Sequence, residues 1–96
     1  MSTKEAYKQK IEAELELAQA KLAKLKARAK SSAADARIKN AKQVNELEQK
    51  FDATKTKLKE LGEASDDAWE DLKGGVESAW GALSAAFRNA AAKFKD

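Results

Sequence analysis

Eight apolar residues in the last third of the chain fall on one line of a helix. They recur at spacings of three and four: Trp69, Leu72, Val76, Trp80, Leu83, Phe87, Ala90 and Phe94. At about 100° per residue of α-helix, this set occupies an arc of roughly 80°. A helix with so narrow an apolar stripe is not stable alone in water. The stripe therefore has to pack against another helix, a second copy of the chain, or a lipid surface.

Two further apolar seams precede this stripe. The first comprises Ile11, Leu15, Ala18, Leu22, Leu25, Ala29, Ser32 and Ala36, and the second comprises Val44, Leu47, Phe51, Thr54, Leu58 and Leu61. Both alternate in threes and fours, as a coiled-coil heptad does. The second seam is one residue out of step with the first, which indicates either a local change in supercoil winding or a turn.

A turn between the two seams would fall within residues 31–35, where Ser32 and Asp35 fit the S-x-x-D capping pattern. No Gly or Pro occurs there, and the neighbouring alanines favour helix. We therefore predict an all-α fold in which residues 1–62 form one long coiled-coil helix. The alternative is a three-helix bundle with an extra turn near Ser31 and Ser32.

The clearest break in the chain lies at Gly62. A glycine suits the C′ position just past a helix end. Asp67 and Glu70 then make a charged variant of the capping box. Residues 63–96 are accordingly predicted to form a second segment, a capped amphipathic helix that carries the Trp/Phe stripe.

Small residues occupy the opposite face of that predicted helix: Gly74, Ser78, Gly81, Ala85 and Ala92. A glycine inside a helix costs about 1 kcal/mol relative to alanine, so two of them on one face call for a reason. Close approach of a neighbouring backbone is one reason. A weakly packed surface, or a hinge at Gly74 and Gly75, is the alternative.

Charge is distributed unevenly along the chain. Residues 1–62 carry 15 Lys/Arg and 9 Asp/Glu, which gives +6, whereas residues 63–96 carry 4 and 7, which gives −3. The basic run comprises Lys21, Lys24, Lys26, Arg28 and Lys30, and the acidic run comprises Glu63, Asp66, Asp67, Glu70, Asp71 and Glu77. Tyr7 is the only aromatic residue among the first fifty, so no base-stacking platform accompanies the lysines. We favour a solvated or self-complementary role for these charges over nucleic-acid binding.

The composition argues against an enzyme. The chain has no His and no Cys, so the usual general base, thiolate nucleophile and metal ligands are missing. We expect no catalytic residue, cofactor, metal or small-molecule substrate. The first residues are polar with no apolar segment behind them, and no stretch approaches the roughly 20 apolar residues that span a bilayer. A cytoplasmic location is expected.

Residues 63–80 read E-A-S-D-D-A-W-E-D-L-K-G-G-V-E-S-A-W and are followed by Leu83, Phe87 and a Lys93-Phe94-Lys95 end. This stretch resembles the A-W-E-D-L-K-x-G-V-x-x-A-W segment of small bacterial coiled-coil proteins known as stress-response proteins. The resemblance implies a soluble bacterial helical protein with an assembly or protective role, and it brings no activity, cofactor or substrate.

We therefore expect a non-enzymatic structural protein that self-associates through helix faces into an oligomer or filament. The resemblance adds the expectation of a stress-related role. An amphipathic-helix module that binds a lipid or membrane surface is the alternative. The residues predicted to form helix interfaces are Ile11, Leu15, Leu22, Leu25, Val44, Leu47, Phe51, Leu58, Leu61, Trp69, Leu72, Val76, Trp80, Leu83, Phe87 and Phe94. Trp69 and Trp80 are expected to be buried. The first seam needs a partner helix, so the protein is predicted not to be a monomer.

Overall fold

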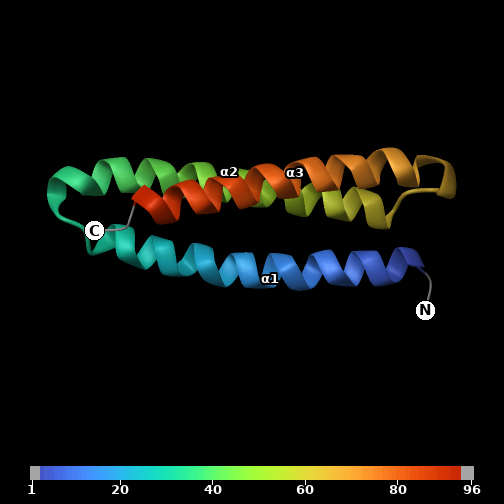
Figure 1. The fold of residues 1–96 in the computed structure, drawn as a ribbon, viewed down its shortest axis with the longest axis horizontal. Helices are drawn as coiled ribbons and strands as arrows, with labels where there is room; N and C mark the ends of the chain where they lie inside the picture. Colours follow the sequence, from blue (N-terminus) through green and yellow to red (C-terminus); the bar gives the residue numbers. More distant parts are fainter. Residues whose placement is uncertain (1–2, 94–96) are drawn as a thin grey trace.

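Three helices account for the architecture. The computed structural model describes residues 3–93, in which it shows α1 (Thr3–Lys30), α2 (Ala34–Gly62) and α3 (Asp66–Lys93), and no strand. Phe94, one of the predicted interface residues, lies outside the described residues. α2 runs antiparallel to both of its neighbours, so α1 and α3 are parallel (Figure 1). The bundle measures 50 × 21 × 17 Å. The all-α class and the break near Gly62 are confirmed, and the arrangement is the three-helix alternative.

The prediction of one continuous helix over residues 1–62 is wrong, because the chain turns between Lys30 and Ala34. Continuous helix would gain a few tenths of a kcal/mol from each helix-favouring residue at the turn. Folding back lets each seam bury the other within one chain, at about 25 cal/mol for every Å² of apolar surface removed from water. The burial of two whole seams outweighs the local preference of a few alanines.

Two serine hydroxyl groups cap the C-terminal end of α1. The Oγ atoms of Ser31 and Ser32 each donate a hydrogen bond to the carbonyl oxygen of Arg28 at 3.0 Å. Asn40, in the second turn of α2, donates from Nδ2 to the Ser32 Oγ at 2.7 Å. The residue before α2 is Ala33, in an extended conformation with no side-chain capping bond. Ser32 thus satisfies a carbonyl at the end of α1. It is not the cap of α2 that its sequence pattern indicated.

Gly62 has a different role from the one predicted. It is the last residue of α2 and does not follow the helix, and none of the described glycines has a positive φ. Glu63, in a right-handed conformation, donates its N–H to the carbonyls of Lys59 and Glu60, both at 3.2 Å. A Cβ at Gly62 would lie 3.2 Å from the Cε of Lys8 on α1. The missing side chain therefore makes room for Lys8 to cross the end of α2.

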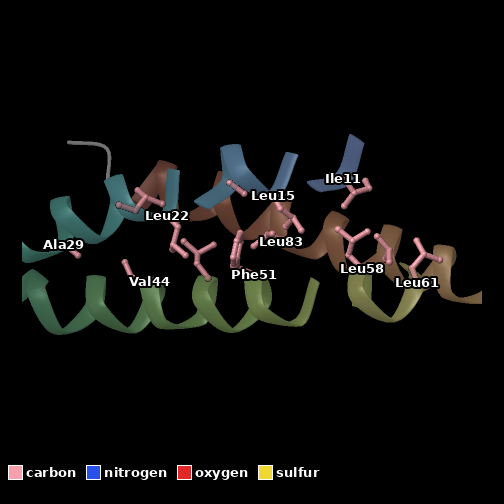
Figure 2. Packing of buried hydrophobic residues seen from close by; sticks show 14 residues of the cluster. Ile11, Leu15, Leu22, Ala29, Val44, Phe51, Leu58, Leu61 and Leu83 are labelled. Atoms are coloured by element: carbon pink, nitrogen blue, oxygen red, sulfur yellow. The ribbon is translucent and has the colours of Figure 1, made fainter. Parts of the chain in front are cut away.

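The core is a single thin apolar seam that runs along α2, and both α1 and α3 pack against it. Figure 2 shows Leu15, Phe51 and Leu83, one from each helix, close together in the apolar core. In the described residues, no Cα of α1 comes within 8 Å of a Cα of α3. The two outer helices are therefore linked by long side chains, while each packs closely on α2.

Candidate functional site

Most of the predicted interface residues form the internal core of one chain. Those that are buried are Ile11, Leu15, Leu22, Leu25, Val44, Leu47, Phe51, Leu58, Leu61, Val76 and Leu83, together with Ala18, Ala29 and Ala90. α2 is thus the partner helix that the first seam requires. An association between copies has to use the outer surface of the bundle.

The remaining members of the aromatic stripe are only half-buried. Trp69, Leu72, Trp80 and Phe87 pack against the core but keep part of their surface exposed. Trp69 and Trp80, predicted to be buried in a helix–helix contact, do pack against the core of the bundle, but each is only partly buried there. A three-helix bundle of this thickness covers the centre of the α3 stripe, at Val76 and Leu83, and leaves its large side chains along the edge.

An aromatic and charged cluster joins the beginnings of α1 and α3. The rings of Tyr7 and Trp69 meet edge to face, with centroids 6.0 Å apart. The Lys73 ammonium lies 5.1 Å from the centroid of the Tyr7 ring, and the Lys4 ammonium lies 5.5 Å from that of Trp69. Lys4 also pairs with Asp66. These contacts hold two parallel helices whose backbones are far apart.

The phenol of Tyr7 belongs to the same cluster. Its hydroxyl donates to the Oε1 of Glu77 at 3.5 Å. Burial raises the pKa of Tyr7 above its ordinary value of 10.0, and the negative charges of Glu77 and Glu14 raise it further. All three effects disfavour the phenolate. Tyr7 is therefore a neutral hydrogen-bond donor in the folded protein.

An open groove of about 690 Å³ runs between α1 and α2. Its floor is apolar, with Leu15, Phe51 and Leu58, but these side chains are almost completely buried. Charges of both signs line its walls: Lys8, Glu12, Glu16, Lys55, Lys59 and Glu63. Because cations and anions are present in equal number, the groove favours neither sign of ligand charge.

The outer face of α3 is open. Gly74, Ser78 and Gly81 are exposed, and a Cβ built on Gly74 or Gly81 would meet nothing within 4 Å. α3 is continuous through Gly74 and Gly75, so the alternative of a hinge at these two glycines is wrong. Within the described part of the chain, no other atom therefore occupies the space beside Gly74 or Gly81.

Charges are segregated between the two ends of the bundle. Lys26 of α1 pairs with Glu48 of α2, with 2.7 Å between Nζ and Oε1, so these two residues lie at about the same height along the bundle axis. The half with the α1–α2 turn, residues 21–49 and 82–93, carries ten Lys/Arg and three Asp/Glu, a net charge of +7. The other half, residues 3–20 and 50–81, carries eight and twelve, a net charge of −4. We call these the basic half and the acidic half.

Comparisons of the chain with protein-family profiles, with curated proteins and with solved structures found no match. The resemblance of residues 63–80 to bacterial stress-response coiled coils therefore stays a prediction. Within the described residues, no helix combines the length and the apolar character needed to cross a membrane.

Sequence reasoning missed Tyr7 as a partner of the aromatic stripe. A signal was present, because Tyr7 lies four residues before Ile11 and extends the first seam by one turn. It also missed the segregation of charge in space. That pattern appears only once the chain folds back, because α1, α2 and α3 each contribute to both halves.

Proposed function

We propose that this chain is a non-enzymatic structural protein whose copies associate through their helix faces into an oligomer or filament. The observation that carries the proposal is the segregation of charge into a basic half of +7 and an acidic half of −4. The basic half of one molecule is thus complementary in charge to the acidic half of a second copy. The protective role in stress that the resemblance of residues 63–80 implies is part of the same proposal.

The physical argument is one of complementarity at short range. At physiological salt the Debye length is about 8 Å, so the two halves attract only when bundles lie nearly in contact. Complementary charge sets orientation and suppresses wrong pairings more than it adds affinity. The proposal therefore expects weak, salt-sensitive association in the micromolar range or above.

Light scattering at low and high salt tests the proposal. Lys21→Glu with Lys24→Glu changes the net charge by −4 within the basic half and should weaken association. Lys55→Glu with Lys57→Glu makes the same change within the acidic half and should leave association intact or strengthen it. A monomeric mass at every concentration in low salt would contradict the proposal, as would equal effects of the two variants.

Binding to a lipid surface is the second candidate. The specific observation in its favour is the edge between α1 and α3, where Trp69, Trp80 and Phe87 are half-buried and the helix backbones stay apart. Separation of α1 from α3 would expose the stripe to lipid. Tryptophan emission with added anionic or zwitterionic vesicles tests this candidate. An unchanged spectrum with both vesicle types would exclude it.

A further inference from the structure

We propose that the outer face of α3 is the contact surface for a second copy of this chain, which lies antiparallel across it about a two-fold axis. The inference rests on the proposed self-association and specifies its geometry. Side by side in parallel, two bundles would place basic half against basic half. The antiparallel arrangement places each +7 half along a −4 half. The charge distribution therefore selects the orientation.

The exposed charges of α3 match in the same orientation. Glu70 and Arg88 are 18 residues apart, which is five turns, so they lie on the same edge of the helix. In an antiparallel pair centred between Ala79 and Trp80, Glu70 of one copy comes within one residue of the level of Arg88 of the other. The two-fold axis repeats this pair, because an isologous interface makes each contact twice.

The other edge of the face carries a similar pair. Asp71 and Asn89 are also 18 residues apart, and both are exposed. The same register brings the Asp71 carboxylate of one copy beside the Asn89 amide of the other. A carboxylate accepts hydrogen bonds and an amide donates them, so this second pair is complementary too.

The strip between these edges allows close contact. Gly74, Ser78, Gly81 and Ala85 are symmetric about the same centre, so that Gly74 comes level with Ala85 and Ser78 with Gly81. Without Cβ atoms at Gly74 and Gly81, a second backbone can approach closely. A two-fold interface closes on itself. The inference therefore specifies a dimer within the wider proposal of an oligomer or filament.

Cysteine cross-linking tests the geometry, since the chain has no native cysteine. Asp71→Cys and Asn89→Cys are made in separate chains, mixed and oxidised. The mixture should give a covalent heterodimer on a non-reducing gel. Each variant alone should give none, because the same residue in two antiparallel copies is about 25 Å apart, beyond the reach of a disulfide.

The other outcomes are distinguishable. Covalent homodimers of each single variant would show a parallel pair and overturn the inference. A dimeric mass by light scattering without any cross-link would place the interface away from α3, and the proposed self-association would survive. A monomeric mass under all conditions would remove both.

Charge reversal at Glu70 and Arg88 gives an independent test. Glu70→Arg or Arg88→Glu alone should weaken dimerisation about tenfold, because symmetry applies each change twice. The double variant should restore it. Gly81→Leu should abolish dimerisation by steric overlap, whereas Ala53→Leu, which enlarges an exposed residue of α2, should not. A double charge variant that stays monomeric, or a dimeric Gly81→Leu, would overturn the inference.

Discussion

Tyr7, in the first turns of α1, and Trp69, in the first turn of α3, meet edge to face, with ring planes at 76°. Because no Cα of α1 comes within 8 Å of a Cα of α3 in the described residues, side-chain contacts such as this ring pair link the two helices. The two residues are 62 positions apart in sequence, and both turns of the chain lie between them. The pair therefore reports whether all three helices are in place.

The first prediction concerns the energy of this pair. A double-mutant cycle with Tyr7→Leu and Trp69→Leu keeps an apolar side chain at both positions and removes the contact between the rings. The coupling energy should be about 0.5–1.5 kcal/mol, measured by urea unfolding. A coupling energy near zero would mean that the two rings contribute only through the area that each buries.

The second prediction concerns the ionisation of Tyr7. A pKa raised in the folded state means that the folded protein holds the phenol proton more tightly than the unfolded chain does. The stabilisation is therefore complete below pH 10 and is lost as the pH rises through the folded pKa. Since Tyr7 is the only tyrosine, absorbance of the phenolate reports it alone.

Two variants separate the causes of this shift. Glu77→Gln should lower the pKa of Tyr7 only in part, because burial is the largest cause. Tyr7→Phe has no phenol to ionise, so the stability of this variant should fall less above pH 10 than that of the unchanged protein. A phenol that titrates at its ordinary pKa in the intact protein would contradict the prediction.

The third prediction concerns Thr54, a fully buried hydroxyl. Its exposed fraction is 0%, and its Oγ1 donates at 2.8 Å to the carbonyl of Lys50 in its own helix. Thr54→Val replaces the hydroxyl with a methyl group and leaves the backbone bonds of α2 in place. Stability should rise by about 1 kcal/mol, because a buried hydroxyl is costly. Thr56→Val, at an exposed position, is the control and should change little.

The fourth prediction concerns the hydrogen bond that crosses the α1–α2 turn. Asn40→Ala removes the donor to Ser32 but also gains helix propensity. Asn45→Ala, on the exposed face of α2, gains the same propensity and loses no such bond. The Asn40 variant should therefore be the less stable of the two by about 0.5–1.5 kcal/mol in thermal or urea unfolding. Equal stabilities would show that the turn does not depend on this bond.

Periodicity predicted the buried residues well because it depends only on local geometry. Ile11, Leu47 and Val76 each mark the centre of a helix face, and any partner would have buried them. The break near Gly62 was also predicted from the sequence, but the reason for a glycine at this position was not. Gly62 accommodates Lys8 from another helix, a contact between residues 54 positions apart that no local pattern contains.

The turn at Ser31 and Ser32 could not be predicted from its own residues. Whether residues 1–62 form one straight helix or two packed helices depends on how much apolar surface the two seams bury against each other. Helix propensity gives no information about that buried area. The contacts of Tyr7 with Trp69 and of Lys26 with Glu48 depend on the same choice. An error at one turn therefore hid every contact that the turn creates.

The separation of the basic and acidic halves also gives the bundle a large electric dipole along its 50 Å axis. The net charge alone then does not predict whether the protein binds to an ion-exchange matrix. Near its isoelectric point of about 9.1, the protein should still bind a cation exchanger through its basic half. It would lie end-on there, with the beginnings of α1 and α3 turned toward the solvent.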